Sequence, residues 1–180
     1  MKCRCFLQVL AAALGLGVAS TGAAYAQTSD AAAGTVKLSA ADQQFVQDAS
    51  QTNATEIAAS KIAFRNSGDP QVRTFLQQMI TDHTKLARSM GALFARKGLD
   101  AAPAADSALV GKLETLKGKE FDQAYVEQIA LEGHRKAVDL FQTESESGSD
   151  AQLKAAAGHA LPTIRHHLAM AQQLAGVMKG

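Results

Sequence analysis

Apolar residues recur every three or four positions along most of the chain beyond residue 38, which is the spacing of amphipathic α-helices. The pattern predicts four long helices, over about 39–65, 70–97, 119–146 and 151–178. Ser39 with Asp42 has the form of a capping box, and Asp69 before Pro70 is a typical helix start. The short break at 66–68 makes the first two helices an antiparallel hairpin.

The connection between the second and third helices is much longer than the others. Residues 99–118 contain Pro103 and a short amphipathic segment. A helix of the predicted length spans about 40 Å, and a connection of this length can cross from one of its ends to the other. Such a crossover favours an all-α, ferritin-like four-helix bundle with a short extra helix in the crossover. Pro162 lies inside the fourth helix, where it predicts a kink.

The N-terminus has the pattern of a secretory signal peptide. Lys2 and Arg4 precede an apolar run over 6–19, and a small-x-small site ends at Ala26. A membrane anchor is the alternative, but the run is shorter than the roughly 20 residues that span a bilayer. We therefore predict cleavage after Ala26, a flexible leader over 27–38, a helical domain over 39–179, and a periplasmic or secreted protein with no later membrane span.

Cysteine usage and charge exclude several classes of protein. Cys3 and Cys5 both lie in the predicted signal peptide, so the processed chain lacks disulfides, thiol nucleophiles and thiolate metal sites. With 18 basic and 17 acidic residues, the chain has no broad positive field for nucleic acid. It also lacks a phosphate-binding loop, a nucleophile elbow and a metalloprotease motif. No motif names a partner, fixes an oligomeric state or predicts a reaction.

Each long helix carries an ionisable residue near the middle of its apolar stripe. These residues are Glu56, His83, His134 and His167. Imidazole and carboxylate groups that converge in a bundle core suit a transition metal such as Cu, Zn or Fe, or Mn. Met79 and Met170 lie about one helical turn from two of the histidines, and thioethers there would suit copper.

A purely structural role is the alternative interpretation of the same residues. Buried histidines are commonly satisfied by hydrogen bonds, here to Glu56, Asp82 or Asn53, and such a network fixes the register of helices. Asp82 points about 100° away from its neighbour His83, which leaves two roles. It is either an outer carboxylate that orients His134 or a solvated group. The remaining ionisable residues singled out, His159, His166, Glu144 and Glu146, are expected at the surface.

Several of these residues also carry a family resemblance. In chain order they are Phe75, Met79, Asp82, His83 and Lys85, then Phe121, Asp122, Tyr125 and Val126, then His134, and last Leu161, Pro162, His167 and Leu168. Their combination resembles the bacterial family called domain of unknown function 4142, over about Ser39 to Ala175. The resemblance implies an exported, ferritin-like helical bundle, and it implies no established activity.

The chain departs from di-iron ferritin-like proteins at three positions. Those proteins use Glu-x-x-His motifs, whereas Ile80, Leu131 and Ile164 stand three residues before the histidines here. The carboxylates that would bridge two irons are therefore missing. We expect a binding or envelope-associated protein with a mononuclear metal site, and the alternatives are a structural interaction module and a metal-dependent oxidoreductase.

Overall fold

The computed structural model describes residues 37–99 and 104–179, and all regular structure in this part of the chain is helical. The elements are α1 (Ala40–Asn66), α2 (Pro70–Arg96), α3 (Ser107–Glu114), α4 (Gly118–Tyr125), the π-helix η1 (Val126–Gly133), α5 (His134–Ser147) and α6 (Ala151–Lys179). The all-α class is confirmed. The predicted signal peptide and most of the predicted leader lie outside the described residues.

The predicted helix starts are present as hydrogen-bonded caps. The Ser39 hydroxyl accepts from the Asp42 amide at 3.0 Å, and the Asp42 carboxylate accepts from the Ser39 amide at 3.3 Å. Asp69 caps α2 by accepting from the amide of Gln71 at 2.7 Å. Asp106 caps α3 in the same way. The starts of these helices are therefore determined by residues close to them in the sequence.

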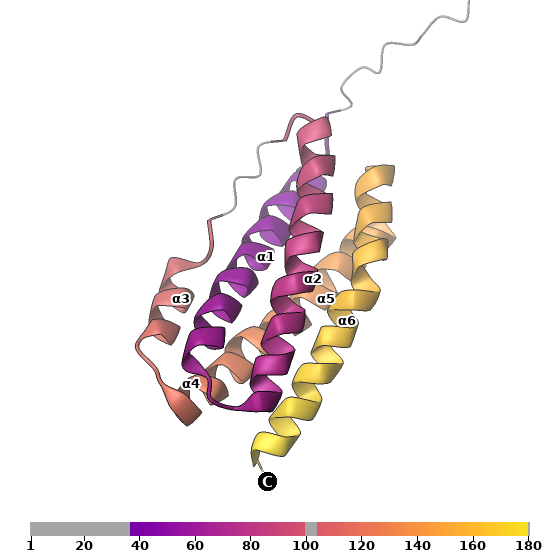
Figure 1. Cartoon of the computed structure of the whole chain (residues 1–180). Helices are drawn as coiled ribbons and strands as arrows, with labels where there is room; N and C mark the ends of the chain where they lie inside the picture. The colour runs from indigo at the N-terminus through magenta and orange to yellow at the C-terminus, as the bar shows by residue number, and fades with distance from the viewer. Residues whose placement is uncertain (1–36, 100–103, 180) are drawn as a thin grey trace, which may run out of the picture. The chain divides into compact units, whose positions relative to one another are not determined.

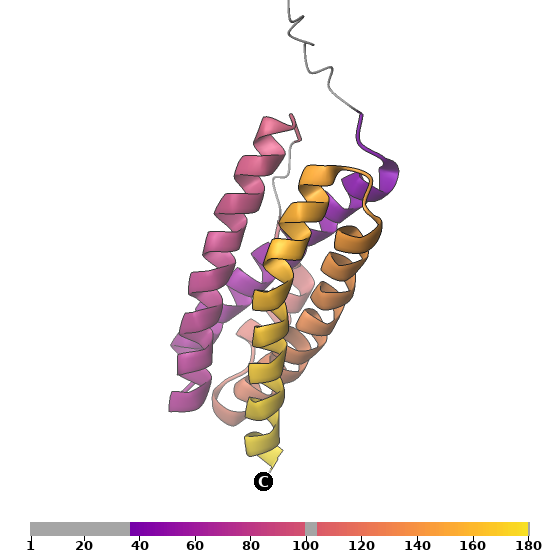
Figure 2. The same cartoon turned by 90° about the vertical axis from the view of Figure 1, so that its right-hand side faces the viewer.

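The long helices pack side by side as a bundle (Figures 1 and 2). α1 packs on α2, α5 packs on α6, and the pairs meet through contacts of α1 with α5 and of α2 with α6. The short helix α3 lies on the outer side of α1. No helix among the described residues combines the length and apolar character needed to cross a bilayer.

The apolar core is divided into two clusters along the bundle axis. One cluster joins the end of α1, the start of α2 and the end of α6, and the other joins the opposite ends of the same helices. On each long helical run, the boundary between the clusters coincides with a buried polar residue. These boundary residues are Asn53 and Glu56 on α1, His83 on α2, His134 on α5 and His167 on α6. The polar residues therefore form a layer between two dry cores.

Two features of this part of the chain differ from the predictions, and one prediction stays open. The third long helix contains η1, where an uninterrupted α-helix was expected. Glu144 is only 4% exposed, which corrects its expected place at the surface. It is buried because the turn after α5 returns to the start of α1, where Asp42 accepts from the Ser149 amide. Helix α6 continues through Pro162, and the kink there stays a prediction.

Candidate metal centre

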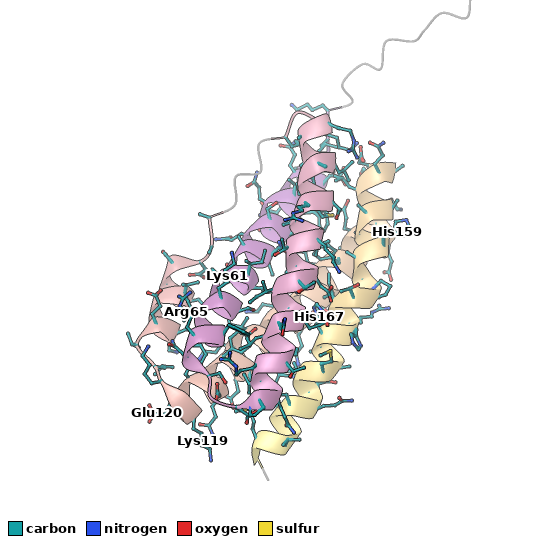
Figure 3. The ribbon with its side chains drawn as sticks, viewed as in Figure 1. Lys61, Arg65, Lys119, Glu120, His159 and His167 are labelled. Carbon is teal, nitrogen blue, oxygen red and sulfur yellow. The ribbon has the colours of Figure 1, made fainter. Side chains whose placement is uncertain are left out.

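Three histidines from three helices meet in the polar layer. His83, His134 and His167 are at most 3% exposed. Each offers one ring nitrogen, and these three atoms lie within 4.8 Å of one another. Figure 3 shows His167 about midway along α6, on the side toward α2, whereas His159 lies nearer the start of that helix, at its outer side. The two flanking histidines, His159 and His166, are exposed, as expected.

Asn53 fixes the orientation and the tautomer of His83. The Asn53 amide group donates to the backbone carbonyl of His83 at 3.2 Å, so the amide oxygen is turned toward the ring. That oxygen lies 2.9 Å from Nδ1 of His83, and Glu56 Oε2 lies 3.1 Å from the same nitrogen. An amide oxygen only accepts, and therefore Nδ1 of a neutral His83 carries the hydrogen. Its Nε2 then presents a lone pair.

Asp82 has the same effect on His167. The Asp82 carboxylate accepts from Nε2 of His167 at 3.1 Å. Burial opposes ionisation of Asp82, but hydrogen bonds from Gln78 and His167 outweigh it and lower the pKa of the carboxyl. Nε2 of His167 therefore carries the hydrogen, and Nδ1 presents a lone pair. Of the two predicted roles, orientation of His134 is wrong, because α2 packs on α6 and turns Asp82 toward His167.

The two free nitrogens of this pair face each other. Nε2 of His83 and Nδ1 of His167 are 3.1 Å apart. With hydrogens fixed on the outer nitrogens by Asn53 and Asp82, both inner nitrogens are acceptors. Two lone pairs repel at this distance unless a proton or a cation lies between them.

The third histidine follows directly from the π-helix. Nδ1 of His134 lies 3.4 Å from Glu56 Oε1 and 3.5 Å from the carbonyl oxygen of Ile129, five residues earlier. Nε2 of His134 is buried and has no hydrogen-bond partner among the described residues. π-helices are rare and recur at functional sites, and η1 ends at the residue before this histidine. The sequence carries no pattern that we could read as a π-helix here.

Glu56 reaches the histidines beside a glycine. A Cβ added to Gly133 would lie 3.4 Å from Glu56 Oε1, so the carboxyl packs against bare backbone at this position. Within the described part of the chain, Glu56 Oε1 accepts no hydrogen bond, although the side chain is buried. Both of its oxygens lie near Nδ1 atoms, one on His83 and one on His134.

Burial keeps the histidines neutral in the folded protein. It lowers the pKa of His134 to about 4. Burial also lowers the pKa of His83 well below its usual value, with repulsion from His134 and His167 adding to the shift and Asp82 opposing it. The pKa of His167 is also lowered by burial, although Asp82 opposes the shift. Burial raises the pKa of Glu56 to about 8. Neutral imidazole is the form that binds metals.

The arrangement is close to that of a metal site with three imidazole ligands. Ligand nitrogens about 2.0–2.1 Å from a tetrahedral ion are about 3.4 Å apart. The His83–His167 pair already has this spacing, so a modest approach of His134 would complete the set. Met79 packs in the apolar cluster and Met170 packs against it.

Two solved structures with similar folds both carry the description DUF305. A DUF305 fragment from Deinococcus radiodurans matches with a TM-score of 0.67 and 18% identity, over 77% of this chain and 97% of that chain. A "putative secreted protein DUF305" from Streptomyces coelicolor matches with a TM-score of 0.66 and 19% identity, over 78% and 94%. At these identities the likeness shows the helical fold alone. The comparison with curated proteins gives no match. The family model described as domain of unknown function (DUF4142) matches residues 27–174, and the chain belongs to this family.

Proposed function

We propose that the protein binds one transition-metal ion through His83, His134 and His167. The 3.1 Å approach of two lone-pair nitrogens is the observation that carries this proposal. A shared proton would also relieve their repulsion, but it would make a buried imidazolium, which the lowered pKa of His83 disfavours. A metal ion satisfies both nitrogens, and it also gives the unpartnered Nε2 of His134 a bond.

The oxygens around the rings support the same set of ligands. Metal-bound histidines generally donate their second N–H to a carboxylate or a carbonyl, which fixes the ring and strengthens the ligand. Asn53 and Asp82 hold His83 and His167 in this way. We assign Glu56 to the outer shell as well, because its oxygens face Nδ1 atoms. This modifies the expected set, in which Glu56 was a fourth ligand, and leaves a coordination position for water or substrate.

The class of metal follows from the ligands. Three imidazoles without thiolate favour Zn, Cu or Fe over Mg and Ca, which prefer oxygen. The ion would supply Lewis acidity or, for copper and iron, electron transfer. The residues on the chain orient the rings and keep them neutral.

We further propose that this is a ferritin-like bundle exported from the cytoplasm. The long connection between α2 and α4 contains α3, which runs beside α1 as a crossover segment would. The signal-peptide pattern before Ala26 supports export, and the description of the Streptomyces neighbour also refers to secretion.

A purely structural hydrogen-bond network is the second candidate, favoured by contacts that need no metal. Asn53 and Asp82 already satisfy one nitrogen on each of two rings. In that case the layer would fix helix register between two apolar clusters. The two candidates differ in whether the inner nitrogens take up an ion.

Titration of the metal-free protein with Co²⁺, Zn²⁺ and Cu²⁺ tests the proposal. We expect one ion per chain, with visible Co²⁺ absorption bands of a low-coordinate nitrogen site. His134→Gln should abolish this site, and His166→Gln, at an exposed position, should leave it intact. Asp82→Asn should weaken affinity by about 10- to 100-fold. Absence of stoichiometric binding by the wild-type protein would leave the structural network as the function of these residues.

A further inference from the structure

A cavity on one flank of the bundle leads to Glu56. It has a volume of about 200 Å³ and lies between α1, η1 and the starts of α3 and α5. Its outer wall includes the exposed residues Gln51, Asp106 and Glu132. Glu56 is the buried carboxyl of the lining, and its two oxygens also lie near His83 and His134. The cavity therefore joins the surface to the polar layer.

Most of the residues that line this cavity have side chains with oxygen atoms. Thr55 supplies a hydroxyl, Gln128 an amide, and Asp106 and Glu132 supply carboxylates. The Thr55 hydroxyl accepts from the backbone amide of Asp106 at 2.8 Å, which fixes the start of α3 beside α1. Lys136 is the one basic group of the lining, and Glu132 pairs with it at 3.3 Å. Such a lining suits a hydrated cation.

Two other cavities reach the outer residues of the site, and neither has this chemistry. The one that ends at Asn53 is about 240 Å³ and is walled mainly by apolar groups such as Met90, Phe94 and Phe141. The one that ends at Asp82, between α2 and α6, is about 600 Å³ and carries Arg96, His159 and Lys85, of which Lys85 pairs with Asp82 at 3.6 Å. An apolar wall opposes a hydrated ion, and a basic rim repels it.

Glycine at position 133 leaves the inner end of the cavity open. Gly133 lines the cavity, and an added Cβ would touch Glu56 Oε1. Bare backbone there gives the carboxyl space to turn between the cavity and the histidines. Glu56 Oε1 at this end makes no hydrogen bond among the described residues and has only Nδ1 of His134, at 3.4 Å, beside it, so an arriving cation can take it as an oxygen ligand.

We propose that this cavity is the passage by which a hydrated divalent cation reaches the three histidines, with Glu56 as its last oxygen ligand on the way. The inference rests on the proposed metal function. It adds a route and a transfer ligand to that function.

A bulky residue at the mouth of the cavity tests whether the cavity is the route by which the ion enters or a part of the site that holds it. Gln51→Trp fills the exposed rim, and Gln47→Trp places the same side chain one turn earlier on α1, outside the lining. Stopped-flow mixing with Co²⁺, followed by chelator-driven release, gives both rate constants for each protein. We expect Gln51→Trp to slow binding and release together, by at least about threefold, with the dissociation constant unchanged. Gln47→Trp should match the wild type.

Charge reversal identifies the route independently. Glu132→Lys should slow Co²⁺ association by at least about threefold at low ionic strength, and salt should reduce the difference. Lys85→Glu, at the rim of the cavity between α2 and α6, should change association less. If Co²⁺ binds stoichiometrically but Lys85→Glu accelerates it while Gln51→Trp and Glu132→Lys have no effect, the passage is refuted and the metal function stands. If Co²⁺ does not bind at all, the proposed function itself fails.

Discussion

A single carboxyl far from the histidines shows how burial changes residue chemistry. Glu144 is 4% exposed, and no residue that the structure describes donates a hydrogen bond to its Oε1. Burial and the negative charge of Asp42 raise its pKa to about 7, with Asp150 adding to the shift and Lys154 opposing it. In the folded protein Glu144 is therefore largely protonated in mildly acidic solution, where an unfolded chain has it ionised.

Stability should decrease with pH because of this residue. The folded-state pKa of Glu144 lies above its ordinary value of 4.5, so the folded state holds more protons between pH 4.5 and about 7. The free energy of unfolding must then decrease as pH rises through this window. Glu144→Gln should remove that loss and stabilise the protein at pH 7.5, relative to pH 4.5, by roughly 1 kcal/mol after allowance for solvent screening.

Urea denaturation of both proteins from pH 4.5 to 8 measures the difference directly. The groups common to wild type and variant cancel in the comparison. A difference that grows with pH and levels above about pH 7 supports the protonated carboxyl. A difference that stays constant across the range would mean that Glu144 is ionised in the fold.

At the scale of the elements, the turn between α5 and α6 depends on the absence of one side chain. Gly148 has φ −55° and ψ 147°, which any residue can adopt. A Cβ there would nevertheless lie 2.7 Å from the backbone oxygen of Glu144, and closer still to its carboxyl. The glycine is therefore required for space.

Gly148→Ala should destabilise the protein by about 1–3 kcal/mol, because the backbone of the turn must move to admit the methyl group. Gly91→Ala is the matched control. Gly91 lies inside α2 with no atom within 4 Å of the added Cβ, so alanine should stabilise that helix by about 0.5–1 kcal/mol. Thermal unfolding of both variants measures the two changes in stability. Equal changes of the same sign would contradict the requirement for space at Gly148.

The helices could be predicted because their determinants are local. Caps at Ser39 and Asp69 and the apolar stripes lie within single elements, and the sequence displays them directly. The π-helix has no such local pattern. The apolar residues of η1 would fit an α-helix equally well, so the sequence does not distinguish the two. The burial of Glu144 depends on Asp42, about a hundred positions earlier, and on the path of a turn. Neither can be derived from periodicity.

The candidate site lies between these cases. Periodicity was sufficient to single out Glu56, His83, His134 and His167, because polar residues interrupted four apolar stripes. It did not give the partner of Asp82, because that depends on the rotation of α2 against α6. The contact of Gly133 with Glu56 likewise depends on how η1 meets α1. The sequence therefore showed which residues form the candidate site, and the structure was needed to show how the helices align them.

At the scale of the whole molecule, the polar layer joins helices that otherwise meet through two separate apolar clusters. His83, His134 and His167 belong to α2, α5 and α6, and Glu56 belongs to α1. A metal bound at the layer would therefore connect the elements on which both clusters depend. Its stabilisation should be global, because no cluster can separate without breaking the site.

Hydrogen exchange of the backbone amides tests this coupling. At a free Zn²⁺ concentration of 100 times the dissociation constant, linkage adds about 2.7 kcal/mol to the free energy of unfolding. Amides that exchange only through global unfolding should then slow by about 100-fold in α1, α2, α5 and α6 alike. His134→Gln should remove this slowing, whereas His166→Gln, at an exposed position, should retain it. Slowing that persists in His134→Gln would contradict a site shared among the helices, whereas slowing of all four helices that His134→Gln abolishes would show that one ion at the layer stabilises the bundle as a unit.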